Sequence, residues 1–187
     1  MYNARLAISN RKFGEFGLSY YGGVYNSYLM EGEEVDDKRS LHLLALDFHT
    51  QINKLTVKGE FVKAMIDVAE DIDESYGTEQ AGGFIEFTYP VIERTICGYN
   101  NAKINTVVRL EAIDMNQGRF KNNFLNTSSI EGDKIGNETK AFVLGLSFRP
   151  TEATSFRANY RKHWSTDILG NPPALLGGFQ FGFASYF

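Results

Sequence analysis

The feature that most constrains this chain is a two-residue alternation of apolar and polar side chains along nearly its whole length. It is clearest near the C-terminus, where Phe179, Phe181 and Phe183 alternate with Gln180 and Gly182. Successive side chains of a β-strand point to opposite faces, so this pattern predicts strands with one apolar face. A 3.6-residue repeat is nearly absent, and the sequence therefore predicts an all-β protein.

Nine segments of the chain show this alternation and are predicted strands: 3–9, 15–26, 41–49, 55–64, 84–89, 104–114, 141–149, 155–163 and a C-terminal strand that includes 179–187. Three predicted connections are short, namely 10–14, 50–54 and 150–154. Four others are long, namely 29–39, 67–80, 116–139 and 165–176, and the connection at 90–102 is intermediate. Short turns at one end and long loops at the other are typical of antiparallel outer-membrane barrels.

The second face of the predicted strands carries charged side chains, which we take as candidate pore-lining residues: Lys58, Glu60, Glu86, Arg109, Glu111, Arg157 and Arg161. Such a set is too highly charged for a small dry core. The apolar face is therefore expected to meet lipid and the charged face a water-filled lumen, which predicts an antiparallel transmembrane β-barrel. The alternative is a soluble β-sandwich with one solvated face.

Composition and length limit the other classes. The 187 residues suit one domain, 1–187, and a net charge of −4 gives no sign of a nucleic-acid partner. A single cysteine excludes an intramolecular disulfide framework and a multi-thiolate zinc site. No apolar run is long enough for a membrane helix.

Motifs for catalysis are weak, and the sequence predicts no enzyme. Of three histidines, only His49 shares a predicted strand face with an acid, Asp47. No nucleophile motif, phosphate loop or metal-ligand spacing accompanies them, so we expect no cofactor and no metal. The segment 71–77 resembles a calcium loop, but its glycine comes one position late and the twelfth position holds Gly82, not Glu.

Acidic residues gather in two of the long connections. Segment 29–39 has five acids and two bases, net −3, and segment 67–80 has six acids and no base, net −6. They could bind divalent cations among lipopolysaccharide phosphates or filter ions at a channel mouth. The alternative interpretation is that they are solvated loop tips.

The C-terminal strand resembles a known signal. An alternating aromatic strand that ends at Phe187, after Phe179, Phe181 and Phe183, is similar to the assembly signal of Gram-negative outer-membrane proteins. Ser185 departs from the pattern, which usually has an apolar residue there. The resemblance implies recognition by the barrel-assembly machinery and a periplasmic C-terminus.

Segments 140–151 and 155–161 look like the penultimate hairpin of porins of the phosphate-selective type and their Bacteroidota relatives, and 107–111 is similar to them too. The resemblance implies a Gram-negative outer-membrane location and partners that include outer-membrane lipid, lipopolysaccharide and small hydrophilic solutes or anions. A homotrimer is one assembly compatible with it. The function that it implies is a porin-like channel for passive diffusion.

The strand count and the selectivity each leave two interpretations. Bacterial single-chain barrels normally have an even number of strands, so nine predicts the C-terminal portion of a larger barrel of about 16 strands. The alternative is a complete eight-stranded barrel with a structural or adhesion role and no conductance, in which one of the nine predicted strands is an overcount.

Arg109, Arg157 and Arg161 could form a basic ladder that favours anions. The acids on the same face could instead pair with them and brace the wall.

Overall fold

The computed structural model describes residues 1–69, 77–120, 132–171 and 173–186, and these form β-structure without a helix. The strands are β1 (Tyr2–Asn10), β2 (Gly14–Val24), β3 (Leu29–Met30), β4 (Glu33–Glu34), β5 (Ser40–Ile52), β6 (Leu55–Ile66), β7 (Glu79–Ile96), β8 (Tyr99–Asp114), β9 (Glu138–Arg149), β10 (Thr154–Ser165) and β11 (Ala174–Ser185). All nine predicted strands are therefore confirmed. The hairpin β3–β4, which lies inside a long connection, was not predicted.

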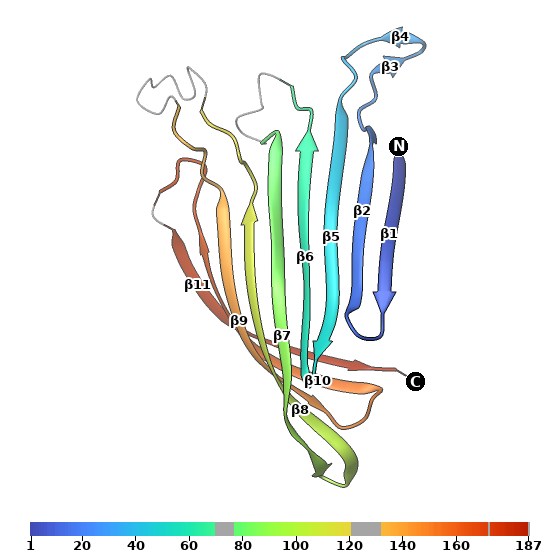
Figure 1. Cartoon of the computed structure of the whole chain (residues 1–187). Helices are drawn as coiled ribbons and strands as arrows, with labels where there is room; N and C mark the ends of the chain where they lie inside the picture. Colours follow the sequence, from blue (N-terminus) through green and yellow to red (C-terminus); the bar gives the residue numbers. More distant parts are fainter. Residues whose placement is uncertain (70–76, 121–131, 172, 187) are drawn as a thin grey trace.

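Nine strands form one sheet in the order β1-β2-β5-β6-β7-β8-β9-β10-β11, and β3 and β4 form a separate pair. Every neighbouring pair is antiparallel, so the sheet is a simple meander. The sheet curls strongly, but β1 and β11 are its two edges and do not pair with each other (Figure 1). The described residues thus form an open antiparallel sheet rather than a closed barrel, and the suggestion that one of the nine strands is an overcount is wrong.

The strand register aligns apolar side chains with apolar ones, and charged side chains with charged ones, in rows across the sheet. One row joins Leu6, Leu18, Leu46 and Phe61 on neighbouring strands, and rows of this kind make up what we call the apolar face. Rows on the opposite side make up the charged face, and one of these contains Lys58, Glu86 and Arg109. Because strand side chains alternate, the register extends the two-faced pattern of each strand to the whole sheet.

The charged face is the enclosed one. Glu86 is 4% exposed and Ser147 3%, whereas Phe181 and Leu6 on the apolar face are 80% and 65% exposed. A curled sheet crowds side chains on its concave side and spreads them on its convex side. The charged face therefore lines the inside of the curl, and large apolar side chains cover the outside.

The long loops and short turns lie at opposite ends of the sheet (Figure 1). We call them the loop end and the turn end. The short turns are 11–13, 53–54, 97–98 and 150–153, and the long connections are 25–39, 67–78, 115–137 and 166–173. The placement of short and long connections at opposite ends of the sheet agrees with the sequence prediction.

The prediction of a connection at 90–102 is wrong, because β7 and β8 continue through it to a tight turn. The register shifts between Pro90 and Ile92 and again between Arg94 and Ile96. Such irregularities accommodate a proline, which lacks the N–H that a regular ladder needs. Cys97 and Gly98 then turn the chain with φ values of 53° and 82°, as a two-residue hairpin loop requires.

Aromatic rings cover glycines within the strands. A Cβ on Gly59 would lie 2.7 Å from the Phe48 ring, and one on Gly177 would lie 2.7 Å from the Tyr160 hydroxyl. Only a glycine lets a ring lie this close to the backbone, and such cover compensates for the missing side chain. This explains how a glycine-rich chain still makes long strands.

Candidate functional site

Five of the predicted pore-lining residues form a continuous row of ion pairs across the charged face, which we call the charge ladder. Lys58 Nζ lies 3.0 Å from Glu86 Oε1, and Glu86 Oε2 lies 3.7 Å from Arg109 Nη1. Glu111 continues the row, with Oε1 at 2.8 Å from Arg109 Nε and Oε2 at 2.7 Å from Arg161 Nη2. Strands β6, β7, β8 and β10 each contribute to it.

Packing holds the centre of the ladder in place. The Arg109 guanidinium lies over the Phe84 ring, 3.7 Å from its centroid, and this contact adds a cation–π attraction. Glu86 Oε1 and Arg109 Nε are buried at ion-pair distance from their partners but lack the alignment of hydrogen bonds. The side chains of β9 opposite this region, Ala141 and Val143, are small enough to leave room for Glu111 to reach Arg161.

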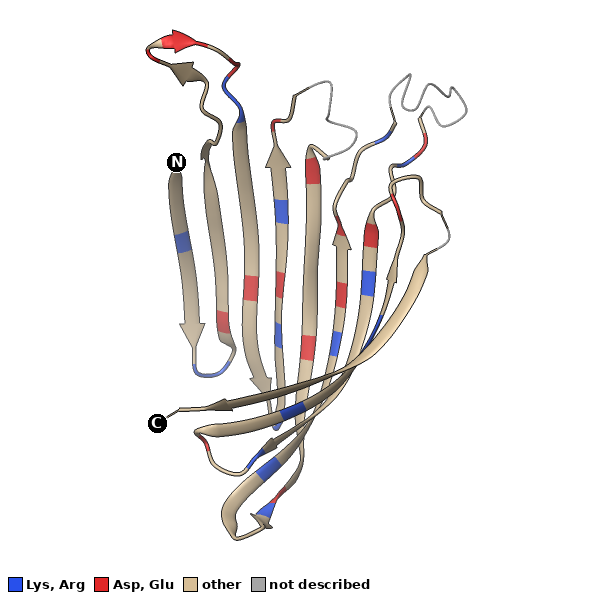
Figure 2. Cartoon of the chain, turned by 180° about the vertical axis from the view of Figure 1, so that it is seen from behind, with Lys and Arg blue, Asp and Glu red and all other residues tan. Residues whose placement is uncertain are grey.

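The ladder is close to electrically balanced, because its three bases face two acids. Both ends of the ladder are bases, Lys58 and Arg161, and Arg161 Nη1 also lies 3.3 Å from His163 Nδ1. Bands of both signs are also interspersed over the middle strands when the sheet is seen from behind (Figure 2). Neighbouring opposite charges stabilise adjacent strands, so the charge ladder is an arrangement that holds neighbouring strands together.

Two predicted residues, Glu60 and Arg157, lie on the charged face outside the ladder. Within the part of the chain that the structure describes, neither has an ion-pair or hydrogen-bond partner for its side chain. The cross-strand partners of Arg157 are Ser147 on β9 and Gly182 on β11, and neither residue is acidic. No described carboxylate therefore pairs with its guanidinium, unlike those of Arg109 and Arg161.

A second ion-pair group on the charged face was missed by the sequence reasoning. Arg5 on β1 donates to Asp47 Oδ1 at 2.7 Å and lies 3.6 Å from Glu15. Alternation placed Asp47 on this face, but nothing in the sequence linked it to a base 42 residues away. The acid considered for catalysis with His49 is thus paired with an arginine instead.

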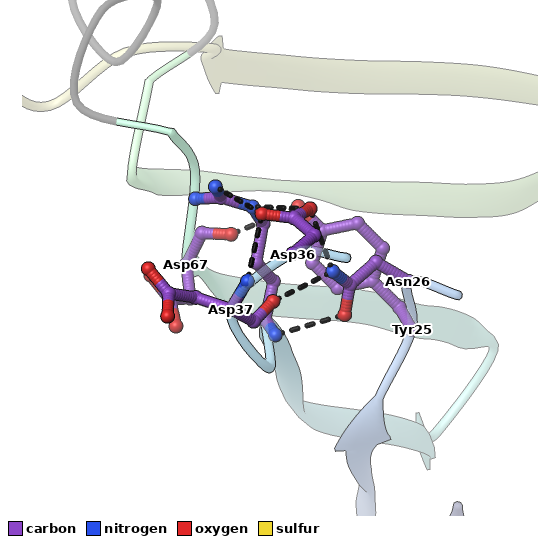
Figure 3. Close-up of polar contacts among 6 residues, drawn as sticks. Tyr25, Asn26, Asp36, Asp37 and Asp67 are labelled. Atoms are coloured by element: carbon purple, nitrogen blue, oxygen red, sulfur yellow. Dashed lines mark hydrogen bonds and ion pairs between the residues drawn. The ribbon is translucent and has the colours of Figure 1, made fainter. Parts of the chain in front are cut away.

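The acidic segment 29–39 is tied to the sheet by a polar cluster at the loop end. The Asn26 amide donates to Asp36 Oδ2 at 3.0 Å and to the Asp37 carbonyl at 2.8 Å (Figure 3). Arg39 donates from Nη2 to Asp36 Oδ1 at 3.0 Å, and its backbone N–H donates to Asn26 Oδ1 at 2.9 Å. Asp36 is therefore engaged within the protein and is not free to bind a cation.

The same cluster reaches the next loop. The Tyr25 hydroxyl donates to the Asp67 carbonyl at 2.8 Å (Figure 3). The Asp67 N–H in turn donates to the Ser40 carbonyl at 2.8 Å. The hydrogen bond between Asp36 and Arg39 lowers the pKa of Asp36 and raises the pKa of Arg39. Residues 70–76, half of the other predicted acidic segment 67–80, lie outside the described residues, as do most of the residues of the calcium-loop resemblance.

Two further loops contact one another at the loop end. Gly136 N–H donates to the Ile168 carbonyl at 2.8 Å, and Asn137 N–H donates to the Asp167 carbonyl at 3.0 Å. Hydrogen bonds from Asn171 lower the pKa of Asp167. Ile135 is only 2% exposed. The described parts of these two loops are thus hydrogen-bonded to each other and are not isolated, fully solvated segments.

The aromatic residues of the predicted assembly signal lie on the outer, apolar face of β11. Phe179 and Phe183 are 73% and 64% exposed, and Phe183 lies 4.9 Å from the Phe156 ring, centroid to centroid. Phe187 lies outside the described residues. Ser185, which departs from the signal, hydrogen-bonds Thr154 Oγ1 at 3.1 Å across the final hairpin.

The site and fold together define a class of protein, namely an all-β antiparallel meander with a charged inner face and an apolar outer face. Comparison with protein-family models, with curated proteins and with solved structures finds no match for this chain. Among the described residues there is no helix long and apolar enough to cross a membrane, and no group of His, Cys, Asp and Glu placed to hold a metal ion.

Proposed function

We propose that this chain forms the wall of an outer-membrane, porin-like channel through which small hydrophilic solutes diffuse passively. The observation that carries the proposal is the inverted distribution of side chains, with charges inside the curl and large apolar groups outside it. A water-soluble sheet buries its apolar face and solvates its polar one. A sheet that meets lipid outside and water inside does the opposite.

The size of the apolar face supports the proposal. Every strand of the large sheet has at least nine residues, and about nine to eleven tilted residues span a bilayer. Exposed apolar side chains occur on strands from one edge to the other, including Leu6, Leu18, Leu46, Phe61, Leu110, Leu144, Phe156 and Phe181. An exposed apolar surface this extensive marks an interaction surface rather than one that faces water.

The edges of the sheet indicate how it would close. Neighbouring strands alternate in direction, so the first and ninth strands, β1 and β11, run the same way. Direct pairing of these edges would be parallel, whereas an odd number of added strands gives antiparallel pairing throughout. Unpaired backbone groups in lipid cost several kcal/mol each. We therefore propose that further strands complete the barrel, as in the larger barrel that the sequence suggested.

Conductance is the direct test of the channel. The purified protein, together with the further strands that complete its barrel, refolded with lipid and added to a planar bilayer, should produce stepwise increases in current. Reversal potentials across a salt gradient would then report selectivity, and the near balance of the charge ladder leads us to expect only a weak anion preference. Insertion into the bilayer without any conductance would overturn the channel proposal.

A non-conducting barrel with a structural or adhesion role is the second candidate. The observation that favours it is the extent of internal pairing, both in the charge ladder and among the packed loops of the loop end. Such pairing strengthens a wall but does not require a pathway for solutes. Membrane insertion together with an ion-impermeable bilayer would support this candidate over the channel.

A further inference from the structure

A pocket on the charged face near the turn end differs in its electrostatics from the rest of that face. We call it the turn-end pocket. It has a volume of about 430 Å³, and its polar lining includes Asn105, Ser147, Arg149, Ser155 and Arg157. Among the described residues, no aspartate or glutamate lines it. The charge ladder, by contrast, alternates bases with acids.

The two arginines of the pocket carry charges that no carboxylate of the described residues offsets. Arg157 has no partner for its guanidinium among the described residues. Arg149 donates from Nη2 to the Glu152 carbonyl oxygen at 3.0 Å, which is a neutral acceptor. Because a guanidinium stays protonated at any ordinary pH, both residues leave positive charge at the pocket wall.

The floor of the pocket offers hydrogen-bond donors that the protein itself leaves unused. Asn105 is 8% exposed, and its side-chain amide has no partner within the described part of the chain. Ser147, 3% exposed, shares one hydrogen bond with Ser155, Oγ to Oγ at 3.2 Å. Only one of the two hydroxyl protons can serve that bond. The Asn105 amide is not closed off from the pocket, so these donors are available to a polar ligand that enters it.

Apart from Thr88, the rest of the pocket lining is largely apolar. Val107 is 4% exposed at the floor, and Ala184 and Tyr186 border the pocket from the C-terminal segment. A carboxylate alone would fill only a small part of 430 Å³, and ligand pockets usually combine a few fixed polar groups with apolar walls. The pocket therefore suits a ligand with one anionic end and a short apolar body.

We propose that the turn-end pocket binds small organic carboxylates. The carboxylate group lies between Arg149 and Arg157 and accepts hydrogen bonds from Asn105 and the serine pair, while the apolar body contacts Val107 and Tyr186. Two guanidinium groups provide the forked donors that match a carboxylate. The inference rests on the proposed function only in taking the charged face to be filled with water.

Calorimetric titration of the full chain in detergent micelles tests the proposal, with benzoate as the probe. Benzamide is nearly the same shape but neutral, and we expect it to bind at least tenfold more weakly than benzoate. Inorganic phosphate, which lacks an apolar body, should also bind more weakly than benzoate. Equal binding of benzoate and benzamide would overturn the anionic site, and phosphate binding as tight as that of benzoate would overturn the organic-acid assignment.

A pair of variants locates the site. Arg157→Gln should weaken benzoate binding about tenfold or more, because it removes a charge-assisted hydrogen bond. Arg11→Gln makes the same change in charge at an exposed turn of the same end and should leave benzoate binding unchanged. Equal effects of the two variants would contradict the site. Loss of the site with conductance retained would leave the channel proposal standing, since the two are measured separately.

Discussion

Glu86 is the residue on which the charge ladder depends, because it is nearly buried between two bases. Lys58 and Arg109 both reach its carboxylate, and Arg109 also pairs with Glu111. Removal of one acid from such a row leaves a base without its counter-charge in a partly desolvated place, and the cost comes mainly from that uncompensated group.

We predict that Glu86→Gln lowers the free energy of unfolding by about 1–3 kcal/mol. Urea titration of the lipid-refolded protein, followed by the fluorescence of Trp164, measures the change. Glu93→Gln is the matched control, since Glu93 pairs with Lys54 at 3.1 Å in a more exposed place. Exposed pairs contribute about 0–1 kcal/mol, and equal losses in the two variants would contradict the role assigned to Glu86.

Gly59 is a second single-residue constraint. A Cβ there would lie 2.7 Å from both the Phe48 ring and the Phe84 carbonyl oxygen. We predict that Gly59→Ala lowers the free energy of unfolding by about 1–3 kcal/mol, as overpacking does. Gly178, where an added Cβ meets nothing within 4 Å, is the control, and Gly178→Ala should change stability by less than about 0.5 kcal/mol. The same urea titration compares the two.

At the scale of elements, the Asp36 carboxylate is one of the groups that hold the loop between β2 and β5. The lowered pKa of Asp36 means that the folded loop favours the ionised form. Its stabilising effect is complete at neutral pH and is lost as the pH falls through that lowered pKa, below the ordinary aspartate value of about 3.9.

We predict that amide protection in the 25–39 segment falls on acidification below about pH 3.9, after correction for intrinsic exchange rates. Asp36→Asn should reduce protection at neutral pH and remove most of this acid dependence. Asp37→Asn is the control, because the Asp37 side chain has no partner among the described residues. Hydrogen exchange followed by NMR or mass spectrometry measures amide protection in the unmodified protein and in both variants. Unchanged protection in Asp36→Asn would contradict the role assigned to Asp36.

At the scale of the whole molecule, the alternation of connections makes the two ends of the sheet distinct. Cys97 is exposed at the tip of the β7–β8 hairpin, at the turn end, and Glu33 lies in the β3–β4 hairpin at the loop end (Figure 1). If the sheet spans a membrane, these two positions lie on opposite sides of it.

We predict that a membrane-impermeant maleimide labels Cys97 from one side of a uniformly oriented vesicle only. In the variant Cys97→Ser with Glu33→Cys, labelling should come from the other side alone. Mass spectrometry of the protein after labelling inside and outside measures both. Labelling of the two positions from the same side would contradict a membrane-spanning sheet, whatever its conductance.

Prediction from sequence succeeded where the signal was local. All nine strands of the sheet were found from alternation, and the seven candidate pore-lining residues all lie on one face. It failed at 90–102, because Pro90 and the Cys97-Gly98 turn resemble a loop although bulges let the ladder continue through them. It also missed the pairing of Arg5 with Asp47, which depends on how β1, β2 and β5 align.

The sequence by itself determined that the chain makes two-faced strands, with charges on one face and apolar groups on the other. This is so because the direction of a strand side chain follows from the local backbone, with a period of two residues. Only the tertiary structure decided which charges neutralise one another and that Arg157 has no counter-charge within the described part of the chain. Ion pairs depend on the register of neighbouring strands and on the curl of the sheet, and both are set by turns and bulges along the whole chain.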